Sequence, residues 1–374
     1  MAVATAVRER VRGDLVRLVH QGVELEDFSR GVTRILGRAV PFDGMCLLTF
    51  DPATLLPTGE IAENALPLGT RERLVEIELR EPDFNKFTAL ARGPRPAASL
   101  SEVTAGDLDR SLRQRELRRP NGFADELRLV MSGSTGTWGA LTLQREANRP
   151  HFTPTEVRFV ASLAGPLADG VRRATMIGDA PADNDDDDPG LLVLAADNTV
   201  EMANRAADRW LGELGADDSA DAPLPVAVRT VASRTRRVAA GESDGVASAR
   251  VHTAGGRWVI VRGSVLSDGP DPKIGLLLEA ARPPELAPLI ADAYSFTERE
   301  RQVTELVAQG FSTSEIASRM HLSAYTVQDH LKTIFEKSGT GSRGELVARI
   351  FFDHYVPRLT PPERVTSREQ KRGW

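Results

Sequence analysis

The sequence predicts a multidomain α+β protein in which two α+β units precede an all-α unit of four helices. Three observations support this prediction. Helix and strand patterns alternate through the first 280 or so residues, an aspartate-rich run interrupts them, and every later apolar-periodic segment is helical. We place the parts at residues 1–177, 178–189 (an acidic linker), 190–284, 290–358 and 359–374 (a disordered tail).

The composition sets limits on the class of protein. A chain of 374 residues holds two or three domains, and its net charge of −6 equals the contribution of the six aspartates in the linker. No strong positive field therefore draws the whole chain to nucleic acid. No apolar run approaches the length of a membrane span, so we expect a cytoplasmic protein without a membrane partner. The single cysteine, Cys46, is interpreted as a small buried strand residue, with a redox sensor as the alternative.

The first unit begins with a helical pattern from Val7 to about Val40, which Pro41 ends. The apolar run GMCLLTFDP then predicts a strand followed by a turn. The charged middle of the unit, with many Arg-Glu neighbours, predicts helices around residues 70–80 and 107–118.

The end of the first unit has stronger local signals. Residues Leu127 to Leu143 predict two strands around a glycine- and serine-rich hairpin. A long helix follows, with Thr153 as N-cap, Pro154 at its first position and Glu156 at its third.

This order of elements resembles a GAF domain, an α+β sensory module with an antiparallel sheet. The resemblance is carried by GMCLLTFDP and WGALTLQREANRPHFTPTEVRFVASLA. It implies a module that binds a small molecule or dimerises, so an unidentified small-molecule effector is one expected partner. No haem or bilin signature is present. His20 and His151 are interpreted as surface or capping residues, because no second ligand stands at metal spacing, and we expect no metal site or cofactor.

The second unit opens with LLVLAADNTVEMANRAADRWL, which predicts a strand, a polar turn, a strand and a helix. Two strands around Gly255 and Gly256 and a final strand in KIGLLLEAA complete it. The stretch DNTVEMANRAADRWL resembles the opening hairpin and helix of a PAS domain. Trp210 and Trp258 are expected in the core, with pocket walls as the alternative.

The acidic linker is interpreted as a solvated spacer, because it has no large apolar residue with which to pack. The alternative is a divalent metal site, but the linker lacks the glycine turn and the terminal glutamate of an EF-hand loop. The proline-rich tail is expected to be disordered, with extra phosphate contacts as the alternative.

The all-α unit contains four short helices with three predicted capping boxes. These pairs are Thr297 with Glu300, Ser312 with Glu315, and Ser342 with Glu345. Gly310 ends the first helix. Only His321 and Leu322 separate the second helix from Ser323, the N-cap of the third, and so tight a turn predicts a helix-turn-helix.

The third helix, Ser323 to Lys337, has two different faces. Val327, Leu331 and Ile334 form an apolar stripe at helical spacing. The opposite face ends in hydrogen-bonding groups and comprises Tyr325, Gln328, Asp329 and Lys332.

Phe296 to Ala348 resembles the LuxR-type DNA-binding domain of bacterial transcription regulators. The matching stretches are TERE, LVAQGFS, SEIASRM, LSAYTVQDHLKTIFEKSG and SRGELVA, in order and without insertion. The resemblance implies that the third helix enters the major groove of double-stranded DNA and that the fourth pairs two modules into a homodimer. The implied DNA-binding residues are Thr313, Tyr325, Thr326, Gln328, Asp329, His330, Lys332 and Lys337.

The chain departs from the family at several of these positions. The family often has Asn at the position of Thr313, Lys at Tyr325, and Lys or Asn at Gln328 and Asp329. It often has Gly at His321, but histidine tolerates the left-handed backbone that this turn needs.

The missing lysines leave residues 294–360 with eight Lys or Arg and eight Asp or Glu, a net charge of zero. Because phosphate neutralisation supplies most non-specific affinity, we expect weak DNA binding by one module and a need for dimerisation. Asp329 accepts a hydrogen bond from cytosine N4 but is repelled by phosphate, so we expect it to act in selectivity.

The sequence therefore predicts a sequence-specific DNA-binding transcriptional regulator controlled by N-terminal sensory domains. An enzyme or nucleotide switch is not expected, because the chain has no phosphate-binding loop, H-E-x-x-H, G-x-S-x-G or receiver-type acidic pair. The remaining alternative is a protein-interaction or small-molecule-sensing module whose helix-turn-helix binds a protein. Salt dependence separates the two, since DNA binding weakens steeply with added salt.

Overall fold

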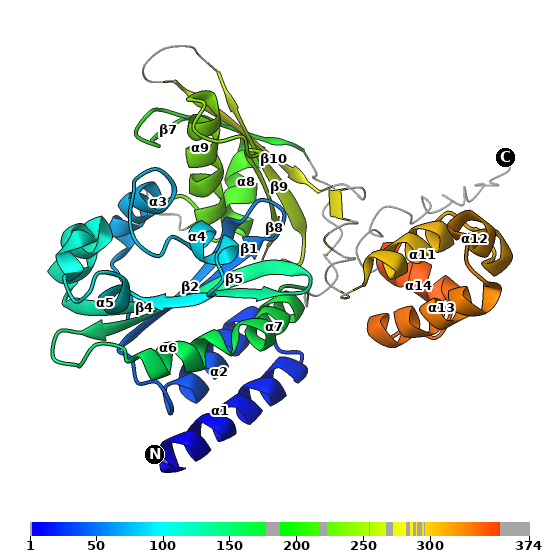
Figure 1. Ribbon diagram of the computed structural model, residues 1–374. Coiled ribbons are helices and arrows are strands. Elements are labelled where there is room, and N and C mark those ends of the chain that lie inside the picture. Colours follow the sequence, from blue (N-terminus) through cyan, green and yellow to red (C-terminus); the bar gives the residue numbers. More distant parts are fainter. Residues whose placement is uncertain are drawn as a thin grey trace, which may run out of the picture. The chain divides into compact units, whose positions relative to one another are not determined.

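The computed structural model describes most of the chain as two compact units (Figure 1). The first unit comprises residues 1–179 and 186–298, and the helical unit comprises residues 299–374 with 180–185. The described residues are 2–176, 188–216, 223–253, 255–266, 272–281, 285–286, 289, 294 and 296–351. The tail and all of the acidic linker except Asp188 and Pro189 lie outside them. Within the described ranges, no helix combines the length and apolar character that crossing a bilayer requires.

The first sheet is antiparallel throughout and follows the order β2-β1-β5-β4-β3. Its strands are β1 (Gly44–Asp51), β2 (Leu56–Glu63), β3 (Ala97–Ser99), β4 (Phe123–Gly133) and β5 (Gly136–Glu146). In the centre of the sheet, Leu47 of β1 lies opposite Leu141 of β5, and both side chains are buried. Cross-strand apolar pairs of this kind fix the register of the sheet.

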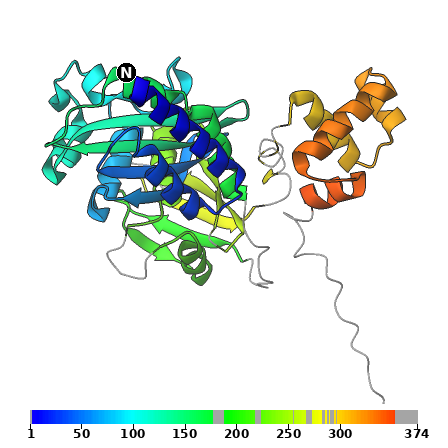
Figure 2. The same ribbon diagram turned by 90° about the horizontal axis from the view of Figure 1, so that it is seen from below.

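Two groups of helices lie on either side of this sheet, with α1 packed on α2 and α7 (Figures 1 and 2). One face carries α1 (Ala2–His20), α2 (Leu25–Leu36), α6 (Pro154–Ala161) and α7 (Ala164–Met176), and the other group is α3 (Arg71–Leu79), α4 (Phe87–Arg92) and α5 (Leu100–Val103). Gly170 lets α7 approach α2, because a Cβ there would lie 2.2 Å from the Phe28 ring. Short helical turns occupy Leu68–Thr70, Leu108–Arg110, Gln114–Arg118 and Arg119–Asn121.

Several predictions for this region are confirmed and several are wrong. The strand at Gly44, the hairpin and the helix near residues 70–80 are present, and the Thr153–Glu156 capping box is complete. The predicted helix from Val7 to Val40 is two helices, separated at Gly22 with its left-handed φ of 62°. Residues 107–118 form 3₁₀ and π turns instead of a regular helix.

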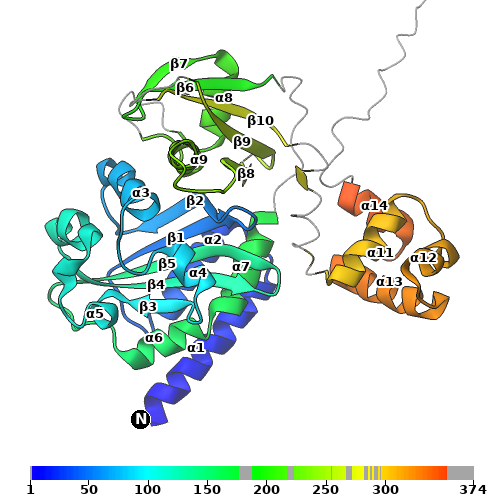
Figure 3. The same cartoon turned by 45° about the horizontal axis from the view of Figure 1, so that its top comes forward.

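The second sheet is also antiparallel and follows the order β7-β6-β10-β9-β8 (Figure 3). Its elements are β6 (Gly190–Leu194), β7 (Val200–Ala203), α8 (Arg205–Glu213), α9 (Val226–Ala239), β8 (Ser248–His252), β9 (Trp258–Val265) and β10 (Ile274–Ala280). Numbered along the chain within each sheet, both sheets have the strand order 2-1-5-4-3. Trp210 is buried in the core as predicted, and Trp258 is half-buried with an edge contact to His252.

The two sheets share contacts within the first unit. Leu56 of β2 is buried in the apolar cluster of the second sheet. The Asp51 carboxylate accepts hydrogen bonds from the Arg250 side chain at 2.6 and 3.0 Å, and both side chains are largely buried. Thr230 of α9 donates a hydrogen bond to the Pro57 carbonyl at 3.0 Å. Helix α9 is therefore in direct contact with the start of β2.

The helical unit contains α11 (Glu298–Ala308), α12 (Thr313–Met320), α13 (Ala324–Ser338) and α14 (Arg343–Phe351). Apolar side chains from all four helices form its core, including Val303, Val307, Ile316, Val327, Leu331, Ile334 and Leu346. Gly310 ends α11 with a φ of 85°, the left-handed conformation predicted for a helix C-terminus.

Candidate nucleic-acid interface

The turn between α12 and α13 is defined by local hydrogen bonds. The capping box that begins α12 is complete, with the Glu315 amide donating to Ser312 Oγ and the Ser312 amide to the Glu315 carboxylate. His321 ends α12 at φ 54° and ψ 44°, and the Leu322 amide donates to the Ala317 carbonyl at 2.9 Å. Ser323 then caps α13 by accepting from the Thr326 amide at 3.0 Å. The predicted helix-turn-helix is confirmed at each of these residues.

The α13 helix separates its apolar and polar residues as predicted. Val327, Leu331 and Ile334 are buried against the rest of the unit. On the outer face Tyr325 is 73 % exposed, and Gln328, Asp329 and Lys332 are also exposed. This outer face is an open ridge of hydrogen-bonding groups on a helix whose opposite face is buried.

The remaining predicted residues lie beside this ridge. Thr326 and His330 are half-buried, and Thr326 Oγ1 shares a hydrogen bond of 2.8 Å with Ser323 Oγ. Thr313 stands at the start of α12 and accepts from Arg343 Nη2 at 3.0 Å. Arg343 also donates to the Phe311 carbonyl at 2.9 Å, so this α14 residue fixes the entry to α12. Sequence reasoning did not single out Arg343, because nothing local distinguishes it from a surface arginine.

Lys337 has a structural contact that the sequence did not reveal. Its Nζ lies 2.6 Å from Oε2 of Glu300, a buried carboxylate on α11. Lys337 therefore ties the end of α13 to α11. Its assignment as a DNA contact stays a prediction.

Replacing Lys337 with Ala is expected to lower the free energy of unfolding of the helical unit by about 1–2 kcal/mol, because a buried carboxylate loses a charged partner that is itself partly exposed. Hydrogen exchange of α11 and α13 amides in the full chain measures this effect. Lys332→Ala is the matched control, since Lys332 is exposed on the outer face. Equal exchange in both variants would contradict the structural role.

The fourth helix begins with half of the predicted capping box. The Glu345 amide donates to Ser342 Oγ at 3.1 Å. The Glu345 carboxylate accepts instead from the Gly341 amide at 2.7 Å. Ser342 is therefore the N-cap as predicted, and only the return contact of Glu345 differs, because it goes to the amide one residue before the cap.

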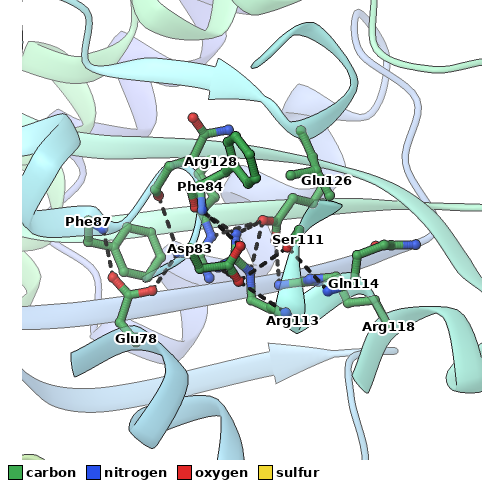
Figure 4. A network of polar contacts seen from close by, with 12 residues as sticks. Glu78, Asp83, Phe84, Phe87, Ser111, Arg113, Gln114, Arg118, Glu126 and Arg128 are labelled. Atoms are coloured by element: carbon green, nitrogen blue, oxygen red, sulfur yellow. Dashed lines mark hydrogen bonds and ion pairs between the residues drawn. The ribbon is translucent and has the colours of Figure 1, made fainter. Parts of the chain in front are cut away.

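A cluster of buried charged side chains on and beside the first sheet was not predicted from the sequence (Figure 4). Arg113 lies between two carboxylates, donating to Asp83 at 2.9 Å and to Glu126 at 3.0 Å. Glu126 also pairs with Arg118 at 2.5 Å and with Arg128 at 3.3 Å. All three arginines and Glu126 are buried. Charges at this depth are stable only when paired, so the cluster is a linked set.

The electrostatics of the cluster follow from its geometry. Burial by itself raises the pKa of Glu126, but attraction by Arg113, Arg118 and Arg128 outweighs it and holds the pKa well below the ordinary range. Burial lowers the pKa of Arg118 to about 10, so Arg118 remains protonated at neutral pH. The cluster is therefore ionised throughout the physiological range.

Comparison with known proteins identifies the helical unit. The family described as "Bacterial regulatory proteins, luxR family" matches residues 294–350. The transcriptional regulatory protein DesR of Bacillus subtilis is 30% identical over 96 residues, 24% of this chain and 48% of DesR. The transcriptional regulatory protein UhpA of Escherichia coli is 46% identical over 55 residues, 15% of this chain and 28% of UhpA. The chain thus spans about half or less of the length of these relatives.

Among solved structures, the ligand-binding domain of VqsR from Pseudomonas aeruginosa aligns with 44% of this chain and 94% of its own, with 17% identity and a TM-score of 0.32. A GAF domain/HD domain protein from Geobacter sulfurreducens aligns with 42% of this chain and 95% of its own, with 16% identity and a TM-score of 0.28.

Proposed function

We propose that the protein is a sequence-specific DNA-binding transcriptional regulator in which α13 reads the major groove. One observation carries the proposal: α13 presents an exposed polar ridge on a capped helix-turn-helix, within the segment that matches the luxR family. A helix of this kind fits the major groove, where base edges present distinct patterns of donors and acceptors.

The ridge residues differ in the contacts they favour. Gln328 is suited to a bidentate contact with adenine, and Asp329 to accepting from cytosine N4. Lys332 supplies the positive charge of the ridge and contacts guanine or phosphate. Because the net charge of the segment is zero, affinity depends on two modules binding together. We propose that α14 pairs them, so that two α13 helices reach half-sites about one helical turn apart.

The first unit is proposed to control DNA binding by the helical unit without a catalytic step. Its first sheet is assigned as a GAF-like sensory module and its second as a PAS-like one, and their shared strand order supports two modules of related architecture. A ligand that favours one arrangement of the unit would shift the population of DNA-binding protein. As a regulator of bacterial promoters, the protein acts in the cytoplasm.

Gln328→Ala and Lys332→Ala are each expected to weaken binding to the cognate promoter by about tenfold or more, because each removes one base-edge or charged contact. Footprinting with the purified full chain on its own upstream sequences measures the loss. Glu305→Ala, an exposed position on α11, is the control and retains binding. Unchanged footprints in both ridge variants would refute the assignment of α13.

A salt titration of the same complexes distinguishes DNA from a protein partner. For a DNA complex the logarithm of the binding constant falls linearly with the logarithm of the salt concentration, with a slope of roughly −0.9 for each neutralised phosphate. A flat profile would favour the alternative, in which the ridge and its exposed Tyr325 bind a protein.

A further inference from the structure

A pocket in the first unit lies where the two sheet-bearing parts meet. Strands β1, β2 and β5 contribute one wall, α3 contributes a second, and the first turns of α9 contribute a third. The space between the lining side chains is about 750 Å³, including the part that opens to solvent. Apolar groups dominate the lining, among them Leu48, Leu66, Leu74, Val75, Leu79, Phe87 and Val226.

Four arginines are prominent among the polar groups of the pocket, beside Glu60, Glu78 and Gln144, whose Oε1 is buried without a partner in the described ranges. Arg118 lines the pocket and is 2 % exposed, yet its Nε and Nη1 have no hydrogen-bond partner among the described residues. Nη1 of Arg229, on α9, is likewise buried without a partner within the described part of the chain. Buried donors without acceptors are costly, so these N–H groups favour an acceptor that enters the pocket.

Four arginines line the pocket, Arg71, Arg118, Arg128 and Arg229, against two glutamates, Glu60 and Glu78. Glu60 lies 3.5 Å from Arg71 and 3.7 Å from Arg229. Glu126 contacts three arginines, Arg113, Arg118 and Arg128, so Arg118 shares this carboxylate with two others. The lining therefore combines an excess of positive charge and unpaired N–H groups with a mainly apolar surface.

We propose that this pocket binds a small organic anion, a carboxylate with an apolar body, and that the bound molecule connects α9 of the second sheet to the first sheet. Arg118 and Arg229 would donate to the carboxylate from the two sides, while the apolar body lies among Leu48, Leu74 and Val75. A planar guanidinium matches the two oxygens of a carboxylate. The inference deepens the proposed function by naming its effector class, and its regulatory meaning rests on that function.

The test uses straight-chain carboxylates from butanoate to decanoate with the purified full chain and no DNA. Calorimetry and thermal melting are expected to show saturable binding and a raised melting temperature for some members of the series. The alcohols and amines of the same chain lengths bind at least about tenfold more weakly, because they lack a charged acceptor. Equal binding of all three classes, or no binding by any carboxylate, would overturn the proposal.

Two substitutions locate the site. Arg118→Lys keeps the charge beside Glu126 but removes the planar fork, and it is expected to weaken carboxylate binding about tenfold or more. Arg113→Lys is the matched control, because Arg113 belongs to the same cluster but does not line the pocket, and it leaves the affinity unchanged. Val226→Phe, at a half-buried position on α9, fills the pocket from that side and reduces binding.

The melting temperature of each variant without ligand shows whether it folds. Wild-type affinity in a folded Arg118→Lys protein would overturn the role of the guanidinium. Wild-type affinity in a folded Val226→Phe protein would overturn the role of α9. Because no DNA is present, the outcome is independent of the proposed function. If the chain binds carboxylates but no promoter, the pocket assignment stands and the proposed regulatory function is refuted. If it binds its promoter but no carboxylate, the proposed function stands and the pocket assignment is refuted.

Discussion

Replacing Val327 with Asp is expected to unfold the helical unit and abolish DNA binding while the first unit stays folded. Val327 is 0 % exposed and packs in the core that α13 shares with the other helices. An unpaired carboxylate at this position costs about 4 kcal/mol or more. A unit of this size has only about 3–5 kcal/mol of stability, so the substitution removes most or all of it. Hydrogen exchange of the full chain, followed in peptides from each unit, measures the amide protection of the two units separately.

Tyr325→Asp is the matched control for this prediction. It places the same charge on the same helix two residues away, at a side chain that is 73 % exposed. Protection of the helical unit is expected to remain at the wild-type level, although DNA contacts of the ridge change. If the Val327→Asp protein kept its slow-exchanging amides in α11 to α14, the core assignment of α13 would be wrong.

The helical unit was the most predictable part of the chain because its signals are local. The Ser312–Glu315 cap, the turn at His321 and the Ser323 cap each depend on residues within one or two helical turns. Hydrophobic periodicity then determined which face of α13 is buried. The pairing of Lys337 with Glu300 was not predictable, because the two residues belong to different helices and no pattern specifies that contact.

The sheets were predicted less completely because strand pairing is not local. Strand β2 has the sequence LPTGEIAE, with little apolar alternation, and β3 has three residues inside a loop-like stretch. Helix α9, which forms a wall of the pocket, was also missed. Many Arg-Glu neighbours occur between residues 60 and 125, so the sequence did not indicate that Arg113 and Arg118 are buried. Their burial arises only when β4 brings Glu126 between them.

Glu126→Gln is expected to destabilise the first unit by about 3–5 kcal/mol, the range for breaking a buried ion pair by removing one partner. The substitution keeps the size of the side chain but leaves Arg113, Arg118 and Arg128 without their shared carboxylate. Urea unfolding followed by tryptophan fluorescence measures the change, since Trp138 is buried in the same sheet. Glu102→Gln is the control: Glu102 pairs with the exposed Arg95, and its loss is expected to cost less than about 1 kcal/mol.

The stability difference between wild type and Glu126→Gln depends on pH, because the pKa of Glu126 is lowered in the folded protein. Its folded pKa lies well below the ordinary 4.5, because the attraction of three arginines outweighs the opposing effect of burial. A group with a depressed pKa stabilises the folded state fully above its unfolded pKa and loses that contribution as the pH falls towards the folded value. The stability difference between wild type and Glu126→Gln is therefore expected to stay constant from pH 7 to about pH 5 and to shrink below pH 4.5. Other titrating groups are common to both proteins, so they largely cancel in the difference. A difference that grew on acidification would mean that Glu126 is not held ionised by its arginines.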